Sequence, residues 1–321
     1  MSFIAKNEKV FVAGHLGLVG SAVTKVLHEK KYNVLTRTRA ELDLLDQGKV
    51  EDFFRKEKPK TVIIAAARVG GINANNTYRS EFIYENLQIQ NNVVWSAYKN
   101  DVDRLVLLGS SCIYPKHAKQ PIAETELLTG PLEYTNRPYA IAKIAGVELV
   151  NSLKIQYKKN YFSVMPTNLY GLNDNFDVET SHVLPALVRK FCEAVRFGHD
   201  SVEVWGSGKP KREFMYVDDC AEAIVFLAEN FDFENYPETK ENWSHINIGY
   251  GEDISIKDLS HLIAEVSGYK GKIIFKTDMP DGTPKKLMDS SILKGLGWKP
   301  KINLNEGVER VVAEYRKRFL G

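Results

Sequence analysis

The sequence predicts an α/β fold, with a Rossmann-type doubly wound parallel sheet and a smaller C-terminal α/β region. Three observations carry this prediction. Short apolar runs alternate with helical stretches through the first half of the 321-residue chain. A glycine-rich turn follows directly on the first apolar run, and the alternation loosens after about Tyr170. Continuous apolar runs separated by helical stretches are typical of parallel strands that helices cover on both faces.

The first half contains the expected strands of the sheet. Four short apolar runs have the length of buried strands, at residues 10–13, 33–36, 62–67 and 105–108. Helices are expected between them. The first helix follows Gly14, where apolar residues recur at helical spacing, and residues 47–58 and 83–99 form two more.

The second half is predicted to be less regular. Residues 173–180 are polar and typical of a loop, and a stretch rich in Gly, Pro and Lys covers residues 206–211. Further elements are expected as one short strand at 201–205 and helices at 181–197, 218–229, 255–268 and 304–319. We expect this part to form the smaller region, partly interleaved with the sheet.

Composition excludes several classes of protein. The 43 basic and 41 acidic residues leave a net charge of +2, which lacks the basic excess typical of nucleic-acid binding. No apolar run is long enough to span a bilayer, and the N-terminal segment lacks the apolar core of a signal peptide. The 3 cysteines and 7 histidines show neither a disulfide framework nor metal-ligand spacing, and Cys192 and Cys220 are expected in the core. We therefore expect a cytoplasmic protein with no metal, no nucleic acid and no membrane partner.

The glycine-rich turn has the arrangement of a dinucleotide-binding loop. Gly14, Gly17 and Gly20 lie between the first strand and the first helix. Glycine there permits a tight turn and close approach of a pyrophosphate to the helix N-terminus. The alternative is that these glycines serve the turn and its packing alone, but the strand–loop–helix context favours cofactor binding. We expect the dinucleotide to contact neighbouring residues as well, namely Leu18, Val19 and Ala66.

Two arginines after the second strand bear on which dinucleotide binds. A carboxylate near this position favours NAD, but none occurs before Glu41. Arg37 and Arg39 instead suit a 2′-phosphate, through charge-assisted bidentate hydrogen bonds. We therefore expect NADP(H), the alternative being that both arginines are solvated surface charges.

Three further residues have the order and setting of a catalytic set. Tyr139 and Lys143 are one helical turn apart, so they lie on one helix face. The lysine charge is expected to lower the pKa of the tyrosine phenol toward the working range. Ser110 follows the strand at 105–108, at the edge where α/β sheets bind ligands, and its hydroxyl can hydrogen-bond a substrate oxygen. The alternatives are an exposed helix face and a polar turn.

Taken together and in this order, the glycine loop, the serine and the Tyr/Lys pair resemble the extended short-chain dehydrogenase/reductase superfamily. Longer stretches narrow the resemblance to the GDP-L-fucose synthase family: GHLGLVGSAV, TRTRAELDLLD, GSSCIYPKHAKQPIAE, NRPYAIAKIAG, MPTNLYG, SHVLPALVRKF, VWGSGKPKREFMYVDD and DGTPKKLMD. The likeness covers nearly the whole chain. It implies an NADPH-dependent 3,5-epimerase-4-reductase that converts a GDP-4-keto-6-deoxy-sugar, GDP-4-keto-6-deoxy-D-mannose, to GDP-L-fucose.

The resemblance also implies residue roles. Ser110, Tyr139 and Lys143 match the reductase triad of the family, and Cys112 and His182 match its epimerisation acid/base pair. The chemistry agrees, because a 4-keto group makes the protons at C3 and C5 acidic, and inverting a centre needs titratable groups on both faces. The ordinary pKa values of Cys (~8.5) and His (~6.5) bracket neutral pH. Lys143 and His182 are also expected at the cofactor. The alternatives are a buried apolar cysteine and a histidine at a helix start.

The substrate is expected on the second half of the chain. By the resemblance, residues 1–170, with a later return near 213–250, form the NADP-binding Rossmann domain, and residues 171–212 and 251–321 form the substrate-binding region for the GDP-sugar. The implied substrate contacts are Asn168, Lys190, Trp205, Arg212 and Lys286. Leu16 and Lys190 stand where the family often has arginine. These departures weaken the preference for NADPH and leave room for another GDP-sugar.

Other functions stay open. A C4 reductase alone, acting on a GDP-6-deoxy-4-keto-heptose or a related GDP-sugar, could retain Cys112 and His182 without their activity. A non-catalytic NADP-binding sensor is the alternative of another class. A 4,6-dehydratase is disfavoured, because such enzymes place an acidic pair where Ser111 and Cys112 stand. The resemblance further implies a homodimer, paired through apolar residues of the helices at 83–99 and 144–157.

Overall fold

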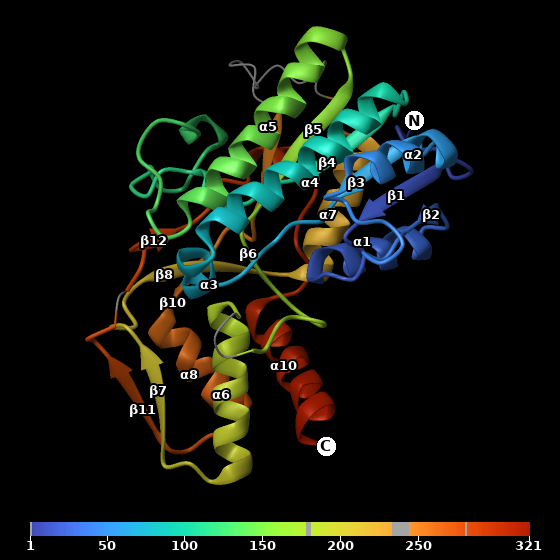
Figure 1. Ribbon diagram of the computed structural model, residues 1–321. Helices are drawn as coiled ribbons and strands as arrows, with labels where there is room; N and C mark the ends of the chain where they lie inside the picture. Colours follow the sequence, from blue (N-terminus) through green and yellow to red (C-terminus); the bar gives the residue numbers. More distant parts are fainter. Residues whose placement is uncertain (1, 178–180, 233–243, 280) are drawn as a thin grey trace.

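The computed structural model describes residues 2–177, 181–232, 244–279 and 281–321. A six-stranded sheet lies at its centre, in the order β2-β1-β3-β4-β5-β9, and all neighbouring strands are parallel (Figure 1). Its strands are β1 Lys9–Ala13, β2 Asn33–Leu35, β3 Thr61–Ile64, β4 Arg104–Leu108, β5 Asn160–Pro166 and β9 His245–Ile248. The chain starts in the interior of the sheet and winds outward in both directions, so the predicted Rossmann-type doubly wound fold is confirmed.

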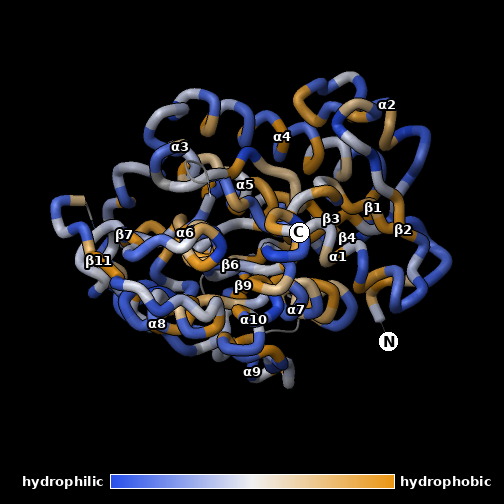
Figure 2. Tube along the Cα trace, turned by 90° about the horizontal axis from the view of Figure 1, so that it is seen from below, coloured by the Kyte–Doolittle hydropathy of each residue, from blue (hydrophilic) through white to orange (hydrophobic). Residues whose placement is uncertain are grey.

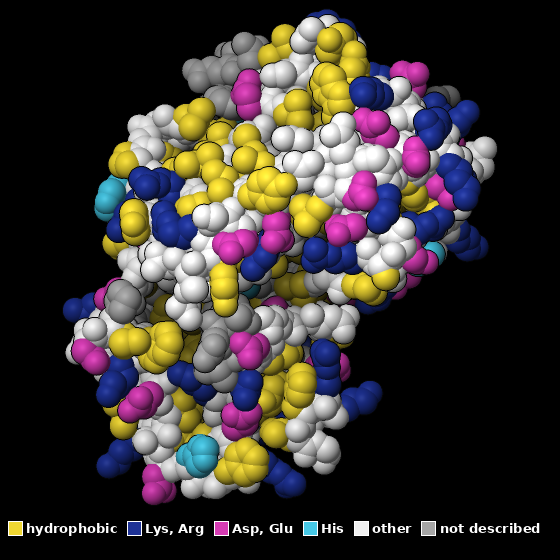
Figure 3. Space-filling view, in the orientation of Figure 1, with side chains coloured by type: hydrophobic (Ala, Val, Ile, Leu, Met, Phe, Trp, Pro, Cys, Tyr) yellow, Lys and Arg dark blue, Asp and Glu magenta, His cyan; other side chains and the backbone are white. Residues whose placement is uncertain are grey.

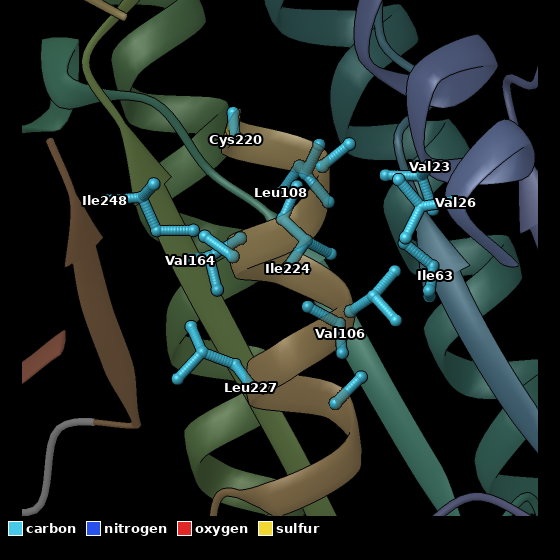
Figure 4. Packing of buried hydrophobic residues seen from close by; sticks show 14 of the residues in the cluster. Val23, Val26, Ile63, Val106, Leu108, Val164, Cys220, Ile224, Leu227 and Ile248 are labelled. Carbon is cyan, nitrogen blue, oxygen red and sulfur yellow. The ribbon is translucent and has the colours of Figure 1, made fainter. Parts of the chain in front are cut away.

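Helices cover both faces of this sheet. One layer pairs α1 (Leu18–Glu29) with α7 (Val217–Asn230), and the other contains α2 (Gln47–Glu57), α4 (Arg79–Lys99) and α5 (Arg137–Tyr157). Side chains alternate between the two layers along each strand. In β4, Val106 faces α7, whereas Leu105 and Leu107 belong to the opposite core. Figure 4 shows Ile224 and Leu227 of α7 lying against the strands in the first of these cores.

The second half of the chain builds a core of its own. A sheet of mixed direction lies across the middle of Figure 1, and a parallel strand pair and three helices lie below it. These elements are β6 Asn168–Tyr170, β7 Ser201–Trp205, β8 Lys211–Tyr216, β10 Asp253–Ser255, β11 Lys272–Lys276, β12 Lys285–Lys286, α6 Val183–Phe197, α8 Ile256–Val266 and α10 Leu304–Tyr315. Phe191, Leu259 and Val308 are fully buried among them.

Several elements differ from the sequence prediction. The strand expected at 62–67 ends at Ile64, which leaves Ala66 at the sheet edge, and α4 begins before the expected residue 83. The sequence did not predict β5, because Asn160, Ser163 and Pro166 interrupt its apolar pattern, yet Ser163 is fully buried. Short elements complete the chain: α3 Ile72–Thr77, η1 Ser111–Ile113, η2 Glu124–Glu126, α9 Ser291–Gly295 and a π-helical turn at Arg316–Leu320.

The hydropathy of the chain differs between the central sheet and the helices that cover it. Figure 2 shows hydrophobic stretches along β1 and β3, between more hydrophilic helices. Cys192 in α6 and Cys220 in α7 are buried in apolar clusters, as predicted. Within the described ranges, no helix combines the length and the apolar character needed to cross a membrane.

Candidate active site

The site forms where the carboxyl ends of the central strands meet elements of the second half. The glycine loop follows β1, and Ser110 follows β4 by two residues. Cys112 lies in the short helix η1 and Lys286 in β12, and both line one cavity. Ligands of open α/β sheets bind at this edge.

The glycine loop is shaped by close backbone approach. Gly14 has φ of +86°, and a Cβ there would lie 2.6 Å from Ala66 N. A Cβ on Gly20 would lie 2.1 Å from Gly14 O, so the first turn of α1 packs directly on the loop. Gly17 differs, because its only near neighbour would be Gly14 O at 3.5 Å, an ordinary contact.

The N-terminus of α1 suits a dinucleotide. Gly17 is its N-cap, and because glycine has no side chain, the cap itself accepts no hydrogen bond from the first turn. The N–H groups of this turn and the positive end of the helix dipole therefore remain for an anion, and the side of Gly17 that lacks a Cβ is open. Leu18, Val19 and Gly20 form this first turn, so the residues present fit a pyrophosphate.

The two arginines expected at a 2′-phosphate have different partners. Arg37 Nη2 lies 2.8 Å from Glu57 Oε1, and its Nη1 donates to Thr36 O. Arg39 is exposed and pairs only loosely with Asp43, at 3.8 Å. The exposed side chain of Leu16 adds no charge to this region. Arg39 is thus the more available cation of the two.

Ser110, Tyr139 and Lys143 come together as the sequence predicted. Lys143, from α5, is almost fully buried, and its Nζ donates to Leu108 O at 2.7 Å. The same Nζ lies 5.8 Å from the centroid of the Tyr139 ring. The Ser110 hydroxyl acts on Tyr139 and Cys112 alike, since hydrogen bonding to it lowers the pKa of each.

One electrostatic expectation is wrong. Burial raises the pKa of Tyr139 well above its ordinary value, and the neighbouring Cys112 raises it further. The Lys143 charge does not offset this, because burial also lowers the pKa of Lys143, to about 8. The loss of solvent around each group is the dominant influence on both pKa values.

Cys112 and His182 both experience the charge of Lys286. Burial raises the pKa of the Cys112 thiol, and Lys286 is the strongest influence that lowers it again. His182 is the N-cap of α6; loss of solvent around its ring lowers its pKa, and Lys286 lowers it further. Burial lowers the pKa of Lys286 itself. The charge of Lys286 thus acts on both members of the predicted acid/base pair.

The expected substrate residues fall into two groups. Arg212 and Lys286 are register partners across the β8–β12 pair, and Asn168 lies on β6, another strand that pairs with β8. Lys190 and Trp205 form the second group: Lys190 Nζ lies 5.5 Å from the Trp205 ring centroid and donates to Glu203 O. Trp205 is 58% exposed, which leaves an aromatic face for a base to stack on.

Sequence reasoning missed part of the cavity wall. The residues that line it beside Cys112 and Lys286 include Lys116, Gln120, Glu133, Asn136, Thr283 and Lys285. Most of these residues lie in the same stretches as Cys112, Tyr139 and Lys286. Their position in those stretches was the available signal, but no spacing rule identifies loop residues that converge only in three dimensions.

Comparison with known proteins gives consistent matches. Residues 10–249 match the NAD dependent epimerase/dehydratase family. The chain is 53% identical to GDP-L-fucose synthase 1 of Arabidopsis thaliana, over 97% of this chain and 94% of that protein. It is 52% identical to the GDP-L-fucose synthase of Escherichia coli (strain K12), over 98% and 99%. Among solved structures, a GDP-mannoheptose C4 reductase from Campylobacter jejuni with NADP bound superposes with a TM-score of 0.88, at 38% identity, over 98% and 99% of the two chains.

Proposed function

Since the chain belongs to the NAD dependent epimerase/dehydratase family and, within it, to the GDP-L-fucose synthase family, we propose that it converts GDP-4-keto-6-deoxy-D-mannose to GDP-L-fucose. The reaction is epimerisation at C3 and C5 followed by reduction of the C4 ketone. The observation that carries the proposal is the shared placement of two sets of groups. Ser110, Tyr139 and Lys143 adjoin Cys112, which faces the same cavity as Lys286.

The cofactor is proposed to be NADP(H), as in the C. jejuni reductase that contains NADP. Gly14, Gly17 and Gly20 would hold its pyrophosphate at α1, and Arg39, with Arg37, would meet the 2′-phosphate. Lys143, whose Nζ donates to Leu108 O at the end of β4, is proposed to hold the nicotinamide end. When bound, NADPH supplies the hydride for C4.

Reduction needs a proton at the C4 oxygen. The Tyr139 phenol is protonated at neutral pH, because burial raises its pKa, so it can donate this proton as the alkoxide forms. Ser110 would hydrogen-bond the same oxygen and hold the ketone against Tyr139. Lys143 would stabilise the tyrosinate that remains.

Epimerisation needs a base and an acid on opposite faces of the ring. We propose that Cys112 and His182 take these roles. The charge of Lys286 lowers the pKa of both groups. A neutral His182 can accept a proton, and its depressed pKa keeps it neutral at pH 7. Epimerisation precedes reduction, because reduction removes the ketone that makes C3 and C5 acidic.

The second half of the chain would bind the nucleotide. We propose that residues 171–212 and 251–321 form the GDP-sugar region, and that residues 1–170 with the return near 213–250 form the cofactor domain. Arg212 and Lys286 suit the diphosphate, with Asn168 beside them, and Trp205 with Lys190 suits the base. The three free cysteines agree with a cytoplasmic location.

A single incubation tests this function. The protein is mixed with GDP-4-keto-6-deoxy-D-mannose and NADPH in deuterated water, and nicotinamide absorbance and product NMR are followed. We expect NADPH oxidation together with deuterium at both C3 and C5. Oxidation without deuterium would reject the epimerase half, and deuterium without oxidation would reject the reductase half. Absence of both signals would point first to a heptose substrate, and to the NADP-binding sensor only if the heptose also gave no reaction.

One observation favours a second candidate. The structural likeness to a GDP-mannoheptose C4 reductase extends over nearly the whole length of each chain. A C4 reductase of a GDP-6-deoxy-4-keto-heptose would consume NADPH with the heptose substrate and would incorporate no deuterium at C3 and C5. Parallel incubations with hexose and heptose substrates therefore separate the two candidates.

A further inference from the structure

Tyr114 lies next to the turn that carries Cys112, and its hydroxyl is held inside the protein. The side chain is 3% exposed, and its hydroxyl donates to Asn247 Oδ1 at 2.6 Å. His245 Nε2 lies 3.2 Å from the same oxygen. Burial lowers the pKa of His245 to about 4, so the ring is neutral and carries a hydrogen on one of its two nitrogens. A buried tyrosine hydroxyl is thus used on two sides at once.

Asn247 connects Tyr114 to the two segments that contain Ile122 and Asp289. Its Nδ2 donates to Ile122 O and to Asp289 O, at 2.9 and 3.1 Å, and its backbone N–H donates to Glu124 Oε1. The amide group therefore uses its oxygen and both hydrogens, with no exposed surface. A fully satisfied buried amide is a rigid junction.

The segment that carries Lys286 is held at this junction. Ile122 N–H donates to Leu287 O, and Asp289 N–H donates to Ile122 O, both at 2.8 Å. On the other side, the Met288 N–H donates to the buried carboxylate of Glu213. The backbone at Lys286 is therefore held by the pairing of β12 with β8 and also by this junction, which connects it through Asn247 to Tyr114, beside the turn of Cys112.

We propose that Tyr114 is a positioning residue for epimerisation: with Asn247 it forms a clamp that sets the separation between the Cys112 thiol and the Lys286 ammonium. This inference rests on the proposed function for its catalytic meaning. The reductase groups Tyr139 and Lys143 stand on α5, outside the clamp, whereas Ser110 caps the short helix of Cys112. The clamp should therefore affect proton exchange at C3 and C5 more strongly than hydride transfer.

The charges around Cys112 define the pH range in which to look. Its titratable neighbours are Lys286, Lys143 and Tyr139, and the cavity wall adds Lys116, Glu133 and Lys285. Of the groups that flank the clamp, Glu124 has a pKa raised by burial to about 7, and His245 titrates lower still. The rate of Cys112 alkylation is therefore compared above about pH 8, where Glu124 is ionised and His245 is neutral.

The test compares two single-oxygen deletions in buried tyrosines. Tyr114→Phe breaks the clamp, and Tyr161→Phe is the matched control, because the Tyr161 hydroxyl donates to Val102 O at 2.9 Å away from the cavity. The rate of Cys112 alkylation by iodoacetamide is followed against pH by peptide mass spectrometry, without substrate. We expect the midpoint to rise by about half a pH unit in Tyr114→Phe alone, as when an ion pair lengthens by about an ångström.

Turnover supplies the second measurement. In Tyr114→Phe, the rate of deuterium incorporation at C3 and C5 should fall roughly tenfold or more. The isotope effect with 4-deuterated NADPH should shrink toward unity, because epimerisation then limits the rate. Asn247→Ser cuts the clamp at its other end and should shift the alkylation midpoint in the same direction.

Two results separate failure of the clamp from failure of the proposed function. An unchanged alkylation midpoint in folded Tyr114→Phe or Asn247→Ser overturns the clamp, even if thermal stability drops as in Tyr161→Phe. A wild-type protein that does not turn over the GDP-sugar rejects the proposed function, while the alkylation profile, which needs no substrate, still decides the clamp.

Discussion

Tyr139 is half-buried, and its phenol keeps its proton. Burial raises its pKa, and the hydrogen bond to Ser110 opposes that rise only in part. This suits a group that must donate a proton to a developing alkoxide. It does not suit a phenolate in the resting enzyme, which the Tyr/Lys spacing alone had suggested.

Removal of the phenol hydroxyl should separate the two half-reactions. Tyr139→Phe is expected to lower the rate of NADPH oxidation by about 10²- to 10⁴-fold, since the general acid is lost. Deuterium incorporation at C3 and C5 should persist, because Cys112 is untouched. NMR of the sugar in deuterated water measures the exchange, and Cys112→Ser is the reciprocal variant, expected to lose that exchange. NADPH oxidation at the wild-type rate by Tyr139→Phe would refute the assignment.

The pH dependence of reduction should report Lys143. Its pKa is lowered by burial to about 8, so the ammonium that stabilises the tyrosinate is lost as pH rises through this value. We expect kcat/KM for NADPH consumption to fall on the alkaline side with a midpoint near pH 8. Lys143→Arg, which stays charged, should remove this limb in whatever activity remains. An alkaline limb unchanged in Lys143→Arg would contradict the prediction.

Lys143 also makes the stability of the fold depend on pH, in the direction opposite to that of activity. Between pH 8 and 10.5 the unfolded lysine binds more proton than the folded one. The contribution of Lys143 to the free energy of unfolding therefore rises with pH in this window. Activity and this part of stability should move in opposite directions, which urea unfolding at several pH values can check against Lys143→Met.

At the scale of elements, the glycine loop separates packing from binding. Gly20 is required by the protein itself, because a Cβ would lie 2.1 Å from Gly14 O. Gly17 has room for a methyl group, so its lack of a side chain matters only to something that approaches from outside. The three glycines, equivalent in the sequence pattern, therefore have different roles.

Two alanine substitutions should show this difference. Gly20→Ala is expected to lower the free energy of unfolding by about 1–3 kcal/mol through overpacking. Gly17→Ala should leave thermal stability near wild type and weaken NADPH binding by about tenfold, or about 1.4 kcal/mol, because the methyl group meets the pyrophosphate. Thermal unfolding and fluorescence titration measure the two effects. Unchanged NADPH affinity in Gly17→Ala would argue against the proposed pyrophosphate position.

At the scale of the whole molecule, one face is unusually apolar. Figure 3 shows hydrophobic side chains gathered over α5 and the adjoining part of α4. Tyr84 and Trp95 of α4 and Ile141 and Ile155 of α5 are all exposed by 40% or more. Such patches mark interaction sites, in agreement with the homodimer that we infer through these helices.

Charge on this face should produce monomers. Trp95→Glu with Ile155→Glu is expected to halve the mass measured by light scattering, because two carboxylates cannot be buried in an apolar interface. Phe197→Glu is the control: Phe197 is 64% exposed at the end of α6, away from α4 and α5. A wild-type mass of one chain, or a double variant that stays dimeric, would exclude this pairing.

Local pattern explains which parts were predictable from the sequence. The strand at 201–205 and the helix starting at residue 47 occur as predicted, because their apolar periodicity and capping residues act within a few positions. Arg37 illustrates the opposite case: the sequence suggested a phosphate partner but could not predict that Glu57 lies 2.8 Å from its guanidinium. The residues next to a side chain in the sequence determine neither its partner in the fold nor how deeply it is buried.

The sequence by itself determined the fold class, the glycine loop and the Ser110, Tyr139 and Lys143 set, because each depends on local spacing on a strand end or a helix face. Only the tertiary structure brought Lys286 into register with Arg212 and into the cavity of Cys112, through the pairing of β12 with β8. It also decided the protonation of Tyr139 and Lys143, since a pKa depends on how much water and which charges the whole fold leaves around a group.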